Sequence, residues 1–197
     1  MAGPAPGYPM SRIIAGVAGG NPLTSVPGTA TRPTTDRVKE ALFSRLESLA
    51  VIDDARVLDL YAGSGSLGLE SASRGARSVA LVEFDAKASD VCQRNAGMVN
   101  QILGHRRVSV HRSKVESYLE RAGDRDAWDL VFLDPPYPLD EEALTAVLTK
   151  LAPHLGEGAV VVVERSSRSP EPAWPEAMEC FADKKYGETT LWFAEPA

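Results

Sequence analysis

Apolar and polar residues alternate along the chain in two rhythms, one typical of strands and one typical of helices. Short β-branched runs predict five strands, at residues 56–60, 78–83, 107–111, 128–133 and 159–164. Between them, apolar residues at helical spacing predict helices at about 67–74, 86–103, 115–121 and 140–152. This alternation predicts an α/β fold, a mostly parallel sheet with helices on both faces.

The two ends of the chain depart from this rhythm. Residues 1–10 hold three prolines and two glycines and predict a flexible N-terminus, whereas residues 11–33 predict a small β-hairpin extension. Thr34 and Thr35 are cap-type residues ahead of an amphipathic helix, with which the main domain of residues 34–197 begins. Strands at 179–186 and 189–194 predict a C-terminal antiparallel hairpin, which brings the sheet to seven strands.

Composition narrows the class of protein. The 197 residues, 44% of them apolar and 24% charged, are typical of one soluble globular domain. No apolar run approaches the roughly 18 residues of a membrane span, and no secretion signal is visible, so we expect a cytoplasmic protein without a membrane partner. Two cysteines, Cys92 and Cys180, are too few and too distant to predict a disulfide framework or a metal site.

Charge is distributed unevenly. The net charge of −6 taken alone opposes a nucleic-acid partner, because phosphate contacts need lysine and arginine. Residues 1–50 carry five basic and three acidic residues, a balance of +2, while the other 147 carry 16 and 24, a balance of −8. The N-terminal part is therefore the basic end of the chain.

A glycine-rich loop follows the first predicted strand. Gly63, Gly65 and Gly68 fit the pattern G-x-G-x-x-G. Glu83 lies at the end of the next strand, where an acid hydrogen-bonds a ribose. This motif suits either NAD or S-adenosylmethionine (SAM). Asp59 favours SAM, because a carboxylate attracts the ammonium group of SAM and would repel the pyrophosphate of a dinucleotide.

The fourth predicted strand ends in the tetrad Asp134-Pro135-Pro136-Tyr137. Two prolines alone would merely end the strand and would leave the acid and the tyrosine unexplained. A carboxylate oxygen of Asp134 and the rigid carbonyl of Pro135 can each accept one N–H of a planar nucleobase amine. Tyr137 offers a stacking face for a base that has left its own stack. The tetrad therefore predicts methylation of an exocyclic base amine.

Four segments together resemble the RsmD family of SAM-dependent methyltransferases, which modify guanine N2 in 16S ribosomal RNA. They are residues 12–16, 31–43, 58–70 and 132–137, and the resemblance extends from about residue 12 to residue 194. It implies a Rossmann-like class I methyltransferase fold, SAM as cofactor, and a monomer. It also implies 16S rRNA as the substrate, within a 30S subunit or assembly intermediate.

The resemblance also assigns roles to individual residues. It places the SAM contacts on Asp59, Ala62, Gly63, Ser64, Gly65, Glu83 and Ser113. The catalytic residues are Asp134, Pro135, Pro136 and Tyr137. Contacts to the RNA substrate are expected from Arg12, Arg32, Thr34, Thr35 and Arg37. No metal is expected.

The sequence departs from the family pattern in two places, and other functions stay open. Residues 17–22 lack the tryptophan and the basic residues that often form a phosphate clamp, and Ser113 stands where an acid usually contacts adenine. One alternative is a DNA methyltransferase acting on an adenine or cytosine amine. Methylation of cytosine carbon 5 is less favoured, because neither cysteine follows a proline. A SAM- or nucleotide-binding module without catalysis and an NAD oxidoreductase are further alternatives.

Overall fold

The computed structural model describes residues 11–28, 35–123 and 127–197. Its helices are α1 (Asp36–Ser48), α2 (Ser66–Ser73), α3 (Ala86–Leu103), α4 (Val115–Arg121) and α5 (Glu141–Leu151), followed by the short 3-10 helix Ala152–His154. Its strands are β1 (Arg56–Leu60), β2 (Ser78–Glu83), β3 (Val108–Arg112), β4 (Trp128–Leu133), β5 (Leu155–Ser166), β6 (Met178–Tyr186) and β7 (Thr189–Pro196).

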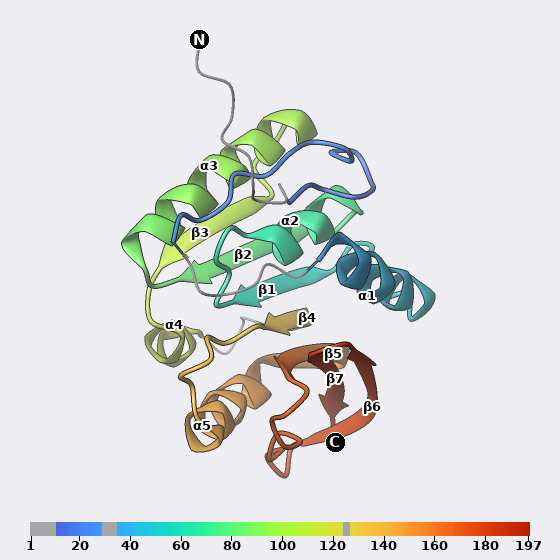
Figure 1. The fold of residues 1–197 in the computed structure, drawn as a ribbon, viewed down its shortest axis with the longest axis vertical. Coiled ribbons are helices and arrows are strands. Elements are labelled where there is room, and N and C mark those ends of the chain that lie inside the picture. Colours follow the sequence, from blue (N-terminus) through green and yellow to red (C-terminus); the bar gives the residue numbers. More distant parts are fainter. Residues whose placement is uncertain (1–10, 29–34, 124–126) are drawn as a thin grey trace.

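The strands form one sheet in the order β3-β2-β1-β4-β5-β7-β6 (Figure 1). Strands β1 to β5 pair in parallel, and β7 runs antiparallel to both β5 and β6. The predicted mostly parallel sheet with a C-terminal antiparallel hairpin is therefore confirmed. Among the described residues, no helix combines the length and the apolar character needed to cross a membrane.

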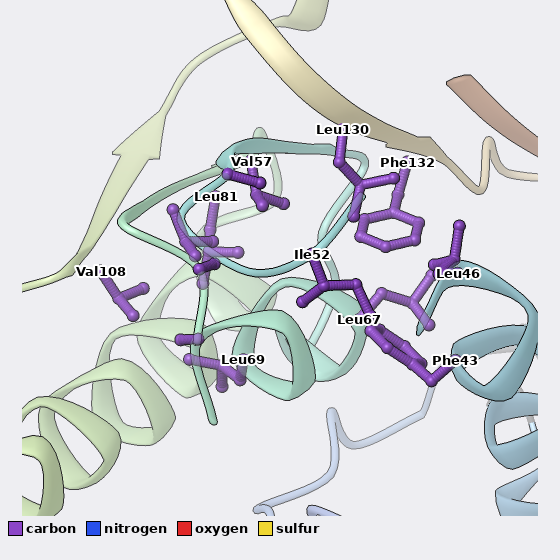
Figure 2. Close-up of a cluster of buried hydrophobic side chains, with 14 of the residues drawn as sticks. Phe43, Leu46, Ile52, Val57, Leu67, Leu69, Leu81, Val108, Leu130 and Phe132 are labelled. Atoms are coloured by element: carbon purple, nitrogen blue, oxygen red, sulfur yellow. The ribbon is translucent and has the colours of Figure 1, made fainter. Parts of the chain in front are cut away.

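Two hydrophobic layers hold the helices against the sheet. Helices α1, α2 and α3 bury their apolar faces on one side, and α4 and α5 bury theirs on the other. In Figure 2, Phe43 of α1 and Phe132 of β4 lie in the first layer, with ring centroids 5.8 Å apart. Both side chains are fully buried. Helix α1 is thereby fixed against the strand that carries the Asp-Pro-Pro-Tyr tetrad.

The order of the strands creates a crevice at one edge of the sheet. From β1 the chain moves outward to β2 and β3, and it then returns to β4 on the other side of β1. The helices that follow β1 and β4, α2 and α5, therefore cover opposite faces, and the carboxyl ends of β1 and β4 flank the switch point where open α/β sheets bind ligands. The glycine loop follows β1 and the tetrad follows β4, so both motifs lie at this crevice.

Within residues 11–28, the part of the predicted N-terminal hairpin that the structure describes, the pairing is one antiparallel bridge, between Arg12 and Pro22. The segment packs against α2 instead of extending into two strands. Ile13 and Leu23 are buried in the same core as α1, α2 and α3. A side chain at Gly16 would place its Cβ 2.0 Å from the carbonyl oxygen of Ser73, so only glycine allows this close approach.

Strand β5 begins earlier than its apolar pattern predicts. Gly156 and Gly158 interrupt that pattern, yet Leu155 already pairs with Trp128 of β4. The register between the two strands then shifts before the next pairs form, as in a β-bulge. Gly158 has a φ of 72°, which favours glycine in this irregular turn of the strand.

Candidate active site

The loop after β1 requires glycine at some positions for its backbone conformation and at another for close packing. Gly63 and Gly65 have φ angles of 58° and 84°, in the left-handed region. Gly65 caps the N-terminus of α2. At Gly68, an added Cβ would lie 2.3 Å from the side chain of Leu81, so the helix can approach the sheet only without a side chain there. No atom lies within 4 Å of a Cβ built on Gly63, so the loop is open at that point.

Glu83 lies directly under this loop. One carboxylate oxygen accepts a hydrogen bond from the backbone N–H of Gly63 at 2.8 Å, and the other accepts one from Asp85 at 2.9 Å. The next residue, Phe84, is 59% exposed, and the ammonium group of Lys114 lies 5.5 Å from the centre of its ring. Sequence reasoning missed Phe84. An aromatic residue directly after the ribose-type acid was the available signal.

Asp59 is buried beneath the loop, with 2% of its surface exposed. It accepts a hydrogen bond at 2.9 Å from the backbone N–H of Gly68. Burial raises the pKa of Asp59 to about 7; the nearby negative charge of Glu83 adds to the rise, and the Gly68 hydrogen bond opposes it. A positive ligand group in the crevice would therefore stabilise the charged form of this carboxylate.

Asn95 of α3 holds the loop from the other side. Its buried side-chain amide donates to the carbonyl oxygens of Ser64, at 2.9 Å, and Thr24, at 3.0 Å. Its own oxygen accepts from the backbone N–H of Thr24 at 2.9 Å. This positioning residue was not predicted, although a polar side chain on the apolar face of a helix would have been the signal.

Lys39 of α1 makes a second buried connection to the loop. Its ammonium group donates to the carbonyl of Arg12 at 2.7 Å and to the hydroxyl of Ser66, the first residue of α2, at 3.0 Å. It lies 3.3 Å from the carboxylate of Glu70, and both side chains are fully buried. Burial lowers the pKa of Lys39, and the attraction of Glu70 opposes this. Helix α1 and the N-terminal segment are thus tied to the start of α2.

The tetrad lies at the carboxyl end of β4. Asp134 is half-buried, Pro135 is buried and Tyr137 is 67% exposed. A pocket is lined by Asp134, Pro135 and Tyr137 together with Glu164 of β5. The pKa of Asp134 is raised well above the ordinary carboxyl range, first by burial and then by the negative charges of Glu164 and Asp59. The carboxylate therefore has an increased affinity for a proton.

The other predicted residues lie as follows. Arg12 is exposed and forms an ion pair with Asp36 at 3.2 Å. The hydroxyl of Thr35 accepts a hydrogen bond from the backbone of α1 and caps this helix, as predicted, while Arg37 is exposed. The predicted contacts Arg32 and Thr34 lie outside the described residues. Substrate roles for this set stay predictions.

Ser113 and Cys92 are engaged within the protein. The hydroxyl of Ser113 donates to the carbonyl of Lys114 and accepts a hydrogen bond from Arg121 at 2.8 Å. Its predicted adenine contact stays a prediction. Cys92 is fully buried in α3, and burial raises the pKa of its thiol. A thiol held in its neutral form is a poor nucleophile.

The groups around the glycine loop suit SAM in their chemistry. The open backbone at Gly63 leaves room for close approach of a ligand, and Glu83 presents a carboxylate at the same point. The exposed ring of Phe84 offers an apolar face for an adenine. Asp59 adds a carboxylate that suits the cationic groups of SAM.

Comparison with known proteins agrees with this geometry. Residues 11–195 match the family described as "Conserved hypothetical protein 95". The ribosomal RNA small subunit methyltransferase D of Escherichia coli strain K12 is 34% identical over 177 residues, which cover 90% of this chain and 85% of that protein. The structure of a hypothetical protein of Thermus thermophilus is 31% identical, with a TM-score of 0.74, and the match covers 93% of this chain and 98% of that chain.

A more distant structural neighbour shows the same fold. The magnesium protoporphyrin IX methyltransferase of Synechocystis PCC 6803, solved with bound SAM, is 15% identical with a TM-score of 0.61. The match covers 82% of this chain and 79% of that chain. The fold is therefore that of class I methyltransferases. By the family match and the relatives of high coverage, this chain belongs to the RsmD family of methyltransferases.

Proposed function

We propose that this protein transfers a methyl group from SAM to the exocyclic N2 amine of a guanine in 16S rRNA, within a 30S subunit or an assembly intermediate. The observation that carries the proposal is the position of the tetrad. Asp134 and Pro135 end a strand directly beside β1, whose carboxyl end leads into the glycine loop. An amine held at the tetrad therefore lies across the crevice from a cofactor held by the loop.

The residues of the tetrad prepare the amine for reaction. The nitrogen lone pair of a base amine is delocalised into the ring, so the amine is a weak nucleophile. The carboxylate of Asp134 and the carbonyl of Pro135 each accept one N–H, which directs the lone pair out of the ring plane. Bound SAM supplies an electrophilic methyl group on a sulfonium centre.

Asp134 also takes up the proton that the amine releases. The nitrogen becomes more acidic as it gains the methyl group, and the carboxylate already accepts one of its hydrogens. The raised pKa of Asp134 favours this transfer. The exposed ring of Tyr137 can stack on the base, and such stacking contributes about 1 to 3 kcal/mol per base.

The test is a methylation assay on small ribosomal subunits from a strain that lacks the gene. The purified protein is incubated with radiolabelled SAM. The nucleosides of the rRNA are then separated by chromatography, and the labelled one is identified by mass spectrometry. We expect label in N2-methylguanosine at one position. Naked 16S rRNA and duplex DNA are parallel substrates. Label on DNA with none on the subunit would refute the proposal in favour of a DNA methyltransferase.

Variants separate catalysis from binding. Asp134→Ala should lose turnover by about 100-fold or more, because it removes both an orienting acceptor and the proton acceptor, while its affinity for SAM is kept. Asp183→Ala, an exposed change on the distant strand β6, is the matched control and should keep full activity. SAM binding is measured by calorimetry. A protein that binds SAM but shows no turnover with any nucleic acid would be a binding module.

A further inference from the structure

Glu164, near the end of β5, lies close to Asp134, the residue that directly follows β4. Phe132 of β4 pairs with Val162 of β5, and both side chains belong to the core on the α1 side. Leu133 and Val163 are the last pair of these strands, so Asp134 and Glu164 are the next residues of the two chains, and the alternation of side chains would place them on the same side. Neighbouring strands lie about 4.8 Å apart. Both residues line one pocket with Tyr137, so the amine-binding end of the crevice holds two carboxylates.

A second carboxylate discriminates between nucleobase amines. The N2 amine of guanine is bonded to a ring carbon whose neighbour N1 carries a hydrogen and is a hydrogen-bond donor. In adenine and cytosine the carbon that bears the amine is bonded to one ring nitrogen, which has a lone pair and acts as an acceptor, and to one ring carbon. A carboxylate on the N1 side of the bound amine therefore attracts guanine, whose N3 acceptor then lies on the other side, and repels the ring nitrogen of adenine or cytosine at the same point. Specificity then comes from both attraction and repulsion.

We propose that Glu164 accepts the N1–H of the target base and thereby selects guanine, while Asp134 and Pro135 hold the N2 amine. This inference rests on the proposed function and names the residue that determines which base enters the site. Glu164 has a second effect on the same reaction. Its charge is one cause of the raised pKa of Asp134, and so it strengthens the acceptor of the released proton.

The test replaces the target guanine by 2-aminopurine, which keeps the 2-amino group but has a lone pair at N1. The methylated position is first mapped by mass spectrometry, and small subunits are then reconstituted with ligated 16S rRNA that carries either base there. The measured quantity is kcat/KM for each enzyme and each base. For the wild-type protein we expect 2-aminopurine to lower kcat/KM by about 10- to 100-fold, as for the loss of a hydrogen bond to a charged group.

The variant Glu164→Gln should reduce this penalty to a few-fold, because the amide can turn its NH2 group toward the N1 lone pair. Loss of the 6-oxo group of guanine affects both enzymes alike, so the difference between their penalties reports on N1 alone. Glu164→Asp keeps a carboxylate and should keep a penalty above about 10-fold. The matched control is Glu157→Gln, an exposed change at the opposite end of β5, which should show the wild-type penalty.

Three results would overturn the inference. Equal penalties in wild type and Glu164→Gln would remove the role of Glu164 and leave the proposed function intact. Equal kcat/KM of the wild-type protein on guanine and 2-aminopurine would also remove the role of Glu164 and leave the proposed function intact. This result needs no variant and holds even if Glu164→Gln fails to fold. A wild-type protein that labels no guanine in the mapping step would overturn the proposed function together with this inference.

Discussion

Replacement of Asp59 by asparagine should change the free energy of unfolding more favourably at pH 8 than at pH 5. The carboxylate is almost fully buried, and its pKa is raised from 3.8 to about 7. A raised pKa means that ionisation is less favourable in the folded chain than in the unfolded chain. The stability that the neutral form provides is complete below about pH 4 and is lost as the pH rises through about 7.

The magnitude follows from the size of the shift. One pKa unit corresponds to 1.36 kcal/mol. The folded-state pKa of about 7 lies roughly two pH units above pH 5, so the wild-type protein loses about 3 kcal/mol of unfolding free energy from this group between pH 5 and pH 8. Asparagine does not ionise, and its carbonyl can still accept the N–H of Gly68. Its buried NH2 group costs about 1 to 3 kcal/mol, but equally at both pH values. The difference between the two pH values is therefore independent of that cost.

Urea unfolding at pH 5 and pH 8 measures this difference. Glu83 and Asp134, which interact with Asp59, are present in both proteins, so their own titration largely cancels. Asp90→Asn, an exposed change on α3, is the control and should show no pH-dependent effect. If the effect of Asp59→Asn changed by less than about 1 kcal/mol between the two pH values, the argument from burial would be wrong.

Three further predictions concern catalysis, cofactor binding and stability. The kcat/KM for methylation should fall with decreasing pH well above the ordinary carboxyl range, because the pKa of Asp134 is raised and its charged form accepts the proton; a fall only near pH 4 would contradict this. Phe84→Ala should weaken SAM binding about 10-fold in calorimetry with little change in kcat, whereas Phe84→Tyr should bind normally. Glu70→Gln should lower the unfolding free energy in urea by about 3 to 5 kcal/mol, because it leaves the buried Lys39 without its anion; the same change should cost less in a Lys39→Met background, and an equal loss there would contradict the reasoning.

The local pattern of the sequence was sufficient for the elements and for the two motifs. Strand and helix rhythms depend on neighbouring residues, so β1, β2 and β4 lie where the apolar runs predict. The glycine loop and the Asp-Pro-Pro-Tyr tetrad are each a short continuous stretch of sequence, and each follows a parallel strand. Because the carboxyl ends of parallel strands share one edge, their meeting at the crevice could be predicted without coordinates.

Contacts between distant elements could not be predicted in this way. Asn95 meets Ser64 and Thr24 across 31 and 71 residues of sequence, and nothing in the local pattern of α3 identifies these partners. The pair Lys39 and Glu70 likewise joins two helices. The apolar patterns of the two helices show only that Lys39 and Glu70 each fall on a buried face. That each is the partner of the other, which makes the burial of both charges tolerable, is known only from the packing.

Under the proposed function, the distribution of charge would separate the recognition of the base from the binding of the RNA backbone. Glu83, Asp59, Asp134 and Glu164 lie at or near the carboxyl ends of four adjacent strands, β2, β1, β4 and β5, at one edge of the sheet. This acidic edge suits a cationic cofactor and the N–H donors of a base, but it repels phosphates. We therefore expect contacts to the RNA backbone from basic groups outside the edge, such as the exposed Arg37 at the start of α1, in the N-terminal part of the chain whose net charge is positive. A substrate base must then leave its own stack to reach the crevice while its phosphates stay at the rim.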